Sequence, residues 1–394
     1  MAPVKSVILG SAAALISFGL ASATSCSGPV INSISYCNPV DQIKYDNIVS
    51  SGSYNDVIGM DLDSCTCSYA PKPVTGSPLD EGLSLHFRGP LQLKQFAVYY
   101  PAPPKQKRSH AHKHLGHHHA HHKRAMVDKP TSEYSDDGVT LPEGLWVRKA
   151  YYDGPSQTVE GLVFMNHRGG QGSGVWDKCG SSISYMSSDT TVGAKNPQIL
   201  QNAPIKSRDE FMIFSDEECD DSCGFSRPGI PAFKGFAGSK KIFVFEFSMP
   251  DDVTPNPNND PELSFNDNMP AIWALNSKIP RTSQYVLGQN SCSCWSSGCG
   301  ELDLFEVLKD ATPMCKSHFH SKKGAGGGDP NYFPRPVNGF VKYAVYFNDD
   351  NSATITKLPD SLKFPKKFSG QAIIANFTGL VAGILSSIFS VPQN

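Results

Sequence analysis

The chain has 394 residues, with 35 Lys and Arg against 37 Asp and Glu, so its formal net charge is only −2. This balance gives no electrostatic reason to bind nucleic acid, and we expect no nucleic-acid partner. Charged residues make up only 18%, while 34 glycines and 30 prolines interrupt the sequence, which favours turns and short strands over long charged helices. No interior stretch reaches the ~18 apolar residues that would indicate a transmembrane helix.

The first 23 residues are typical of a signal peptide. Lys5 provides a positive start, residues 7–20 are an apolar run, and Ala21-Ser22-Ala23 has the small-residue pattern of a cleavage site. We therefore expect a secreted, extracellular protein whose mature chain begins near Thr24.

Secretion makes the 11 cysteines candidates for disulfides. The early four can pair among themselves, but the late seven leave one over, so either one thiol is free or a bridge joins the two parts. The pairing itself does not follow from the spacing. The early set is Cys26, Cys37, Cys65 and Cys67, and the late set is Cys179, Cys219, Cys223, Cys292, Cys294, Cys299 and Cys315.

Residues 24–100 are predicted to form a small, disulfide-stapled N-terminal β module, with strand-like stretches at 59–62 and 83–100. Residues 101–135 are a Pro/His-rich linker with eight histidines between His110 and His122, which has little to bury and should be disordered. Its histidines either bind metal or are solvated groups that gain charge as the pH falls through ~6.5. Its dibasic pairs, Lys107-Arg108 and Lys123-Arg124, are candidate processing sites.

Residues 136–360 are predicted to be all-β, a concanavalin-like jelly-roll β-sandwich. Strand-like runs occur at 145–148, 161–165, 241–247 and 340–347, separated by clusters of turn residues. Many short strands with turn signals, over a segment of about 200 residues or more, are typical of sandwiches and jelly rolls.

Residues 361–394 end in an apolar tail. This tail is a candidate lipid-anchor signal to membrane or wall, and the alternative is a terminal segment that packs on the protein. A glycosylation sequon, Asn376-Phe377-Thr378, lies just before it.

The most informative stretch is residues 300–308, in which Glu301, Asp303 and Glu306 alternate with apolar residues. In a regular strand Glu301 and Asp303 share a face and Glu306 points the opposite way. A β-bulge between Asp303 and Glu306 would insert one residue and bring all three acids to one face. Leu302 and one or both of Leu304 and Phe305 would then face the core.

Three carboxylates on one sheet face repel one another and are poor for stability, so their presence indicates a chemical role. Glycoside cleavage is such a task, because it needs one carboxylate as nucleophile or base and one protonated carboxyl as acid. The alternatives are an edge strand with solvated acids or a calcium site.

Aromatic residues near the acids are candidates for sugar binding. Trp273 lies in the segment 268–275, and Trp295 lies in a cysteine-rich loop six residues before Glu301; a Trp ring can stack on a pyranose face. For Trp273 the alternative is a position in the core. His318 and His320 alternate downstream, so both can face one side of the next strand. The nearby cysteines and histidines superficially resemble a zinc set, but the Cys-x2-Cys spacing is missing and secretion favours disulfides; we expect no metal and no cofactor.

Together these residues resemble glycoside hydrolase family 16, the laminarinase-like enzymes. That family carries Glu-x-Asp-x-x-Glu on a bulged strand, matched here by residues 301–306, and a Pro-Ala-x-Trp segment matched by residues 270–273. A His on the following strand is matched by His318 or His320, and a later aromatic strand, loosely, by residues 340–347. More closely, residues 35–360 resemble a fungal cell-wall family of glycosyl hydrolases of the target-of-SBF type.

The resemblance implies a retaining endo-1,3-β-glucanase of the cell wall that acts on β-glucan polysaccharide. We expect the protein to be a monomer. Glu301 would be the nucleophile, Asp303 its helper and Glu306 the general acid/base. Glucan transglycosylation and non-catalytic glucan binding are the alternatives, and a metal-handling role of the His-rich segment is a third. Tyr346 stands where the family usually has Trp, and the cysteines around the acidic strand are unlike laminarinases.

Overall fold

The computed structural model describes residue 26 and residues 28–49, 52–102, 144–252, 266–283, 292–321, 326–369 and 385–392. The predicted signal peptide, the His-rich part of the linker with its dibasic pairs, and the sequon lie outside the described residues. Among the residues that are described, no helix is both long and apolar enough to cross a membrane.

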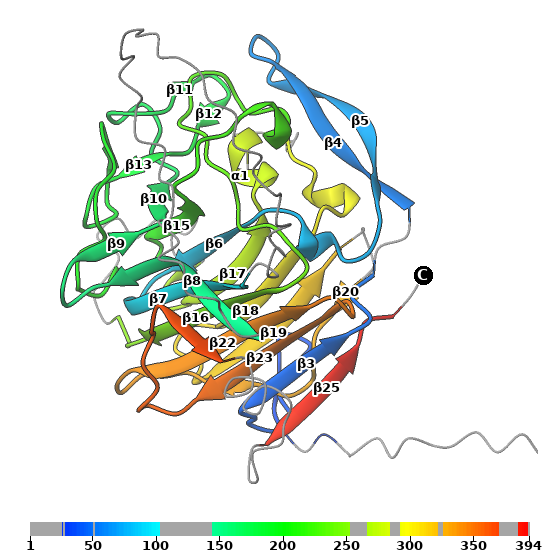
Figure 1. Cartoon of the computed structure of the whole chain (residues 1–394), viewed down its shortest axis with the longest axis vertical. Coiled ribbons are helices and arrows are strands. Elements are labelled where there is room, and N and C mark those ends of the chain that lie inside the picture. The colour runs from blue at the N-terminus through cyan, green and yellow to red at the C-terminus, as the bar shows by residue number, and fades with distance from the viewer. Residues whose placement is uncertain are drawn as a thin grey trace, which may run out of the picture.

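Two large sheets, one of ten strands and one of nine, pack face to face (Figure 1). The ten-stranded sheet runs in the order β14 (Gly193–Ala194), β13 (Ser184–Met186), β10 (Leu162–Asn166), β15 (Glu210–Ser215), β6 (Leu83–Arg88), β17 (Ala271–Asn276), β18 (Glu301–Glu306), β19 (Met314–His320) and β20 (Gly326–Gly327), with β21 (Phe333–Pro334) also on β19.

The nine-stranded sheet runs in the order β24 (Lys367–Ser369), β8 (Leu145–Asp153), β7 (Gln92–Pro101), β16 (Lys241–Ser248), β22 (Val341–Asn348), β23 (Ser352–Leu358), β3 (Gln42–Asp46) and β25 (Ser386–Ser390), with β9 (Thr158–Glu160) on β8. The smaller elements are the pairs β1 (Val30–Ile31) with β2 (Ile34–Ser35), β11 (Trp176–Asp177) with β12 (Gly180–Ser181) and β4 (Gly52–Asp61) with β5 (Thr66–Val74), the helix α1 (Lys278–Thr282), and single 3-10 turns at Pro78–Asp80, Asp221–Cys223 and Trp295–Ser297.

The main hydrophobic core lies between the two sheets. Each inner strand contributes alternate apolar side chains to it, such as Leu85 and Phe87 of β6 and Phe243 and Phe245 of β16, all fully buried. Aromatic rings meet across the layers, for example Phe87 and Phe245 with ring centroids 6.2 Å apart. The predicted all-β sandwich is therefore confirmed, and the runs predicted at 145–148, 161–165, 241–247 and 340–347 correspond to β8, β10, β16 and β22.

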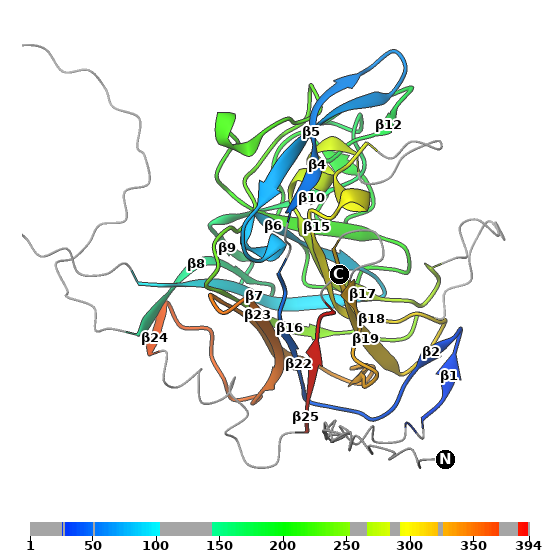
Figure 2. The same ribbon diagram turned by 90° about the vertical axis from the view of Figure 1, so that its right-hand side faces the viewer.

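The predicted N-terminal module is woven into both sheets. The run 83–100 is not one strand: it breaks at residues 89–91, so that β6 lies between β15 and β17 while β7 lies between β8 and β16 in the opposite sheet (Figures 1 and 2). Gly89 allows this crossing, because a Cβ there would lie 2.1 Å from the Lys206 carbonyl oxygen. The sequence boundary near residue 100 therefore does not separate two sheets, and β7 pairs directly with β8 from the other side of the linker.

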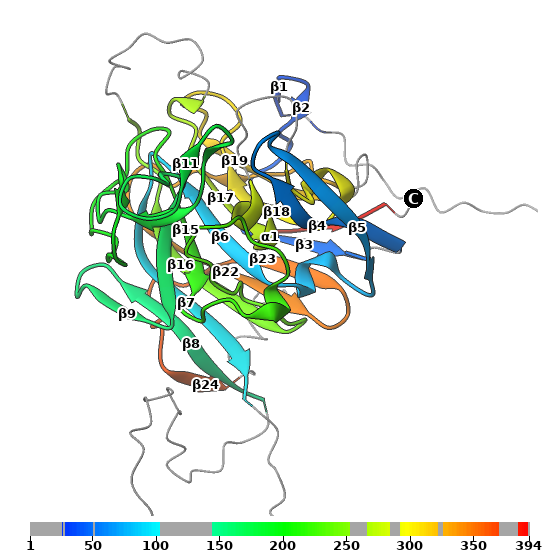
Figure 3. The same cartoon turned by 90° about the horizontal axis from the view of Figure 1, so that it is seen from above.

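The β4–β5 hairpin is the part of the N-terminal segment that projects from the sheets, over the end of β17 and β18 (Figure 3). Disulfides Cys65–Cys179 and Cys67–Cys292 tie its tip to the later part of the chain. The early cysteines thus do not close on themselves, apart from Cys26–Cys37. Two bridges join the two parts, and Cys315 remains as a buried free thiol.

The end of the apolar tail packs on the sandwich. Strand β25 pairs in parallel with β3, Phe389 contacts Tyr45 with ring centroids 5.7 Å apart, and Val391 is buried. Residues 385–392 therefore form a terminal segment that packs on the protein, which is the alternative to a lipid-anchor signal. The preceding residues 370–384 lie outside the described part of the chain.

Candidate active site

The acidic strand β18 contains the predicted bulge. Ile272 of β17 pairs with Phe305, but its neighbour Trp273 pairs with Asp303, so Leu304 is an extra residue opposite β17. The pairing of β18 with β19 shifts at the same place, between Asp303 and Glu306. Leu302, Leu304 and Phe305 all lie in the core between the sheets. The bulge therefore restores the parity that places Glu301, Asp303 and Glu306 on the opposite, outer face.

The strand registers extend this outer face across four strands. Residues paired directly in antiparallel strands lie on the same side of a sheet, so the pairs define three rows. These rows are Ser84–Leu275–Glu301–His320, His86–Trp273–Asp303–His318 and Arg88–Ala271–Glu306–Lys316. The structure thus brings the three acids together with both predicted histidines, which lie on β19 directly beside Glu301 and Asp303.

Glu301 and Asp303 each have a specific hydrogen-bond partner. The indole Nε1–H of Trp295 donates to Glu301 Oε2 at 2.5 Å, and His320 Nε2 lies 2.9 Å from Asp303 Oδ2. Below them, the Ser317 hydroxyl donates to the Asp303 carbonyl oxygen at 2.6 Å. The buried Tyr45 hydroxyl donates in turn to Ser317 at 3.0 Å. The middle of β18 is therefore fixed both from its outer face and from the core.

Burial and crowding raise the proton affinity of this pair of acids. Burial, together with the nearby Asp303 carboxyl, raises the pKa of Glu301 to about 8. Burial and the charge of Glu306 raise the pKa of Asp303 well above its ordinary value, although Arg88 opposes this. Burial lowers the pKa of His318 to about 4, so this imidazole is neutral at physiological pH. The outer face thus combines carboxyl groups of high proton affinity with a neutral histidine.

Glu306 is held from β6, the strand contributed by the N-terminal segment. Arg88 Nη2 lies 3.4 Å from Glu306 Oε1, and Arg88 Nε donates to the Met269 carbonyl at 2.8 Å. The guanidinium also lies over the Trp273 ring, 5.9 Å from its centroid. This fixed cation gives the Glu306 carboxyl group a defined orientation on the sheet face.

Comparison with known proteins matches the N-terminal and C-terminal parts of the chain to two models of one family. The family model "Cell wall protein YJL171C/Tos1, C-terminal" matches residues 144–375, and its N-terminal counterpart matches residues 41–101. The chain belongs to the YJL171C/Tos1 family of cell wall proteins.

Relatives in this Tos1 family cover most of the chain. It is 38% identical over 418 residues to "Probable circularly permuted 1,3-beta-glucanase TOS1" of Saccharomyces cerevisiae, covering 83% of this chain and 88% of the relative. It is 34% identical over 436 residues to the Candida albicans protein of the same name, covering 86% and 91%. No solved structure matches the chain.

The two predicted tryptophans of this Tos1-family chain differ in exposure. Trp295 is 46% exposed, whereas Trp273 is 6% exposed. The Trp273 ring stacks on His86, with ring centroids 5.1 Å apart, and belongs to one buried cluster with Tyr54 and Ile279. Burial of this kind does not fit the expected role of Trp273 as a sugar-stacking platform; the ring instead supports the outer face from which Asp303 projects.

Sequence reasoning missed the β6 contribution to the site. Ser84, His86 and Arg88 recur at every second position, the spacing that puts side chains on one face of a strand. His86 Nε2 lies 2.8 Å from the Ser84 hydroxyl, and burial lowers the pKa of His86 well below its ordinary value. The alternation was visible in the sequence, but nothing local to it indicated that β6 lies two strands from the acids.

One group of described residues has the spacing of a metal site. Carboxylate oxygens of Glu301 and Asp303 and a ring nitrogen of His320 lie within 4.8 Å of one another. These atoms are already paired within the protein, His320 with Asp303 and Glu301 with Trp295. We interpret the group as an acid pair with its hydrogen-bond partners and do not assign the three residues as metal ligands.

Proposed function

We propose that this chain is a secreted cell-wall glycoside hydrolase that cleaves internal β-1,3-glucan linkages with retention of configuration. The observation that carries the proposal is the bulge at Leu304, which gathers Glu301, Asp303 and Glu306 on one sheet face. The 1,3-β-glucanase names of the relatives support the substrate class. Membership in a cell wall family and the five disulfides support an extracellular location.

In this proposal the two glutamates divide the chemistry. The Glu301 carboxylate attacks the anomeric carbon, while Glu306 gives a proton to the glycosidic oxygen that leaves. Water then attacks the glycosyl–enzyme bond, and Glu306 takes its proton as Glu301 departs. One carboxyl of the neighbouring pair Glu301 and Asp303 retains a proton, because two neighbouring carboxyls in a buried site cannot both be charged at low cost. In the reacting form the charge is on Glu301 and the proton is on Asp303. The half-buried His318 and His320 line the same face and are proposed to contact the sugar.

The first test is the substitution Glu301→Gln, assayed by release of reducing ends from a soluble β-1,3-glucan. We expect no measurable release from the variant, because Gln cannot form the glycosyl ester, and an unchanged circular dichroism spectrum. Glu218→Gln, at an exposed carboxylate that is not on β6, β17, β18 or β19, is the matched control and should retain full activity. Equal rates for wild type and Glu301→Gln would remove the catalytic assignment.

Mass analysis of products from a defined β-1,3-oligosaccharide separates the remaining functions. Shorter sugars alone mean hydrolysis, and products longer than the substrate mean transfer to another glucan. Binding to insoluble glucan with no product at any enzyme concentration would overturn the enzyme proposal in favour of a glucan-binding wall protein.

A further inference from the structure

A small disulfide-closed loop lies directly before the acidic strand. Cys294 and Cys299 are joined, and the 3-10 turn Trp295–Ser297 lies between them. The amides of Ser297 and Gly298 donate to the Cys294 carbonyl at 3.1 and 3.2 Å, so the loop is also closed by its own backbone. A single residue, Gly300, separates the loop from Glu301. The position of Glu301 therefore depends directly on the position of this loop.

The N-terminal hairpin β4–β5 holds the loop from outside. The Asn55 amide donates to the Ser297 hydroxyl at 2.9 Å, and the Ser297 hydroxyl lies 3.3 Å from the Asn55 carbonyl. The disulfide Cys67–Cys292 joins the hairpin to the chain two residues before the loop. Two kinds of contact, one covalent, thus connect the hairpin to the segment that precedes β18.

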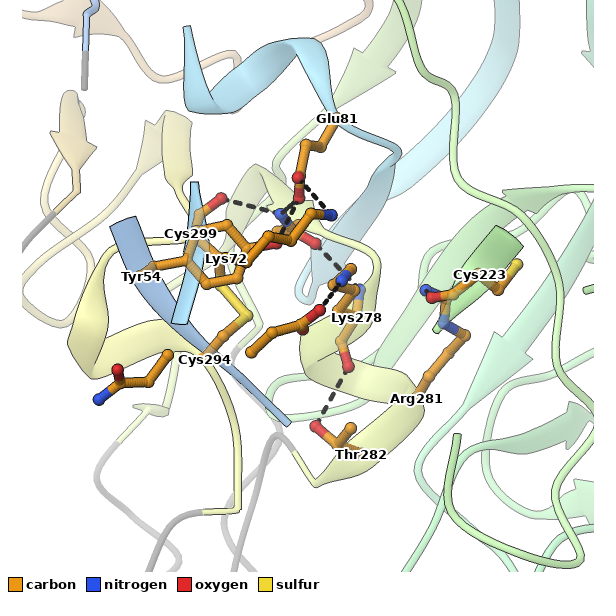
Figure 4. Close-up of polar contacts among 12 residues, drawn as sticks. Tyr54, Lys72, Glu81, Cys223, Lys278, Arg281, Thr282, Cys294 and Cys299 are labelled. Atoms are coloured by element: carbon orange, nitrogen blue, oxygen red, sulfur yellow. Dashed lines mark hydrogen bonds and ion pairs between the residues drawn. A yellow bond between two sulfur atoms is a disulfide. The ribbon is translucent and has the colours of Figure 1, made fainter. Parts of the chain in front are cut away.

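A partly buried polar network fixes the other end of the loop (Figure 4). Glu81 accepts hydrogen bonds from the Tyr54 hydroxyl and from Asn276 Nδ2, each at 2.8 Å, and pairs with Lys72 at 2.7 Å. Asn276 Nδ2 also donates to the Cys299 carbonyl at 2.9 Å, and the Asn276 amide donates to the Gly300 carbonyl at 3.1 Å. The last two carbonyls before Glu301 are therefore fixed by a network that includes the hairpin.

The loop places the indole nitrogen of Trp295, the one polar atom of that side chain, next to Glu301. The side chain is 46% exposed, yet its Nε1–H lies 2.5 Å from Glu301 Oε2. An indole N–H can only donate, so this contact favours a carboxylate oxygen that accepts. The ring also tilts toward His320, with centroids 6.1 Å apart. An aromatic residue that served only as a sugar platform would need its ring face and not this hydrogen bond.

We propose that Trp295 is a positioning residue for Glu301, that its N–H fixes one oxygen of the nucleophilic carboxylate, and that the hairpin-anchored disulfide loop holds it there. The role deepens the proposed function and rests on it. The charged and titratable groups on the outer face of the strands around Glu301 are Asp303, Glu306, Lys316, His318, His320, His86 and Arg88. Asp303 and Glu306 oppose the charge on Glu301, while Trp295 and His320 favour it.

The decisive variant is Trp295→Phe, which keeps an aromatic face and removes the N–H. We expect kcat to fall about 10- to 100-fold, the range for losing a hydrogen bond to a charged group, with KM little changed. The acid limb of kcat/KM against pH should move to higher pH, because Glu301 loses a group that stabilises its charge. Trp176→Phe, at a 66% exposed tryptophan of the β11–β12 pair, is the matched control and should change neither.

The loop itself is tested by Cys294→Ser with Cys299→Ser. This double variant should shift the acid limb in the same direction as Trp295→Phe while the protein remains folded by circular dichroism. A wild-type pH profile in the double variant would show that the disulfide does not hold Trp295 in place, which would overturn that part of the proposal.

A readout independent of glucan cleavage separates this inference from the proposed function. Glutamate carboxyl groups labelled with a stable isotope can be titrated by NMR, with the Glu301 signal assigned by its loss in Glu301→Gln. Glu301 should titrate at higher pH in Trp295→Phe than in wild type, whatever the substrate. A normal titration and a normal kcat with a raised KM would show that Trp295 is a sugar platform only, and would overturn the proposal.

Discussion

The outer face of the ten-stranded sheet has two halves of opposite character. Over β10 and β15 the outward side chains are Val163, Met165, Met212 and Phe214, which are buried beneath loops that contribute Ile183 and Phe233. Over β6, β17, β18 and β19 the same face carries the acids, the histidines and Arg88. The inward side chains of both halves are apolar and share one core.

The difference shows that one sheet serves two purposes on the same face. In the apolar half, burial stabilises the fold by about 25 cal/mol for each Å² of apolar surface removed from water. The acidic half gives up stability, because burial raises the proton affinity of Glu301 and Asp303 and so opposes their charged forms. Substitutions in the two halves should therefore separate catalysis from stability.

The largest expected effect is on catalysis in the acidic half. Glu306→Gln removes the group proposed to protonate the leaving oxygen, and we expect kcat/KM to fall about 10³-fold or more. Unfolding by urea should change little, because Glu306 is partly exposed. Activity close to wild type would show that the two halves do not differ as proposed.

The apolar half should show the reverse behaviour. Phe214 is fully buried beside Val163 and Phe233, so Phe214→Ala should lower the free energy of unfolding by about 3–5 kcal/mol. At a temperature where the variant is folded, its kcat/KM should match wild type. A loss of activity in the folded variant would show that the covering loops also shape the site.

Because of Glu301, the free energy of unfolding should fall as the pH rises, which is opposite to the pH dependence that a salt-bridged acid produces. Its folded pKa of about 8 lies above the unfolded value of about 4.3. Its contribution is fully present below pH 4.3 and is lost as the pH rises toward 8. Relative to wild type, Glu301→Gln should therefore gain stability between pH 4 and pH 8, on the order of 1–3 kcal/mol by pH 7. Urea unfolding at several pH values measures this; a difference that stays constant with pH would contradict it.

The smallest expected effect is a shift in the pH profile. Asp303 helps to raise the pKa of Glu301, so Asp303→Asn should move the acid limb of kcat/KM to lower pH, by about one unit. This is opposite in sign to the shift expected for Trp295→Phe, and the two variants can be compared in one assay. An acid limb that stays in place or moves up would show that Asp303 does not oppose the charge on Glu301.

Much of this protein could be predicted from local sequence patterns. The strands around 145, 162, 241 and 341 follow from alternation and turn residues, and the spacing of Glu301, Asp303 and Glu306 already required a bulge if the acids were to act together. Both features are local, because side chains two apart on a strand share a face whatever lies beside that strand.

Only the tertiary structure decided what meets the acids. Local pattern cannot specify which strands pair, since pairing depends on how distant segments pack into common sheets. For this reason the sequence could not predict that residues 83–100 divide between two sheets or that Arg88 approaches Glu306. It also could not predict the burial of Trp273 or the bridges Cys65–Cys179 and Cys67–Cys292. The contact of Trp295 with Glu301 belongs with them, because a loop closed by a disulfide and held by a distant hairpin sets where that side chain points.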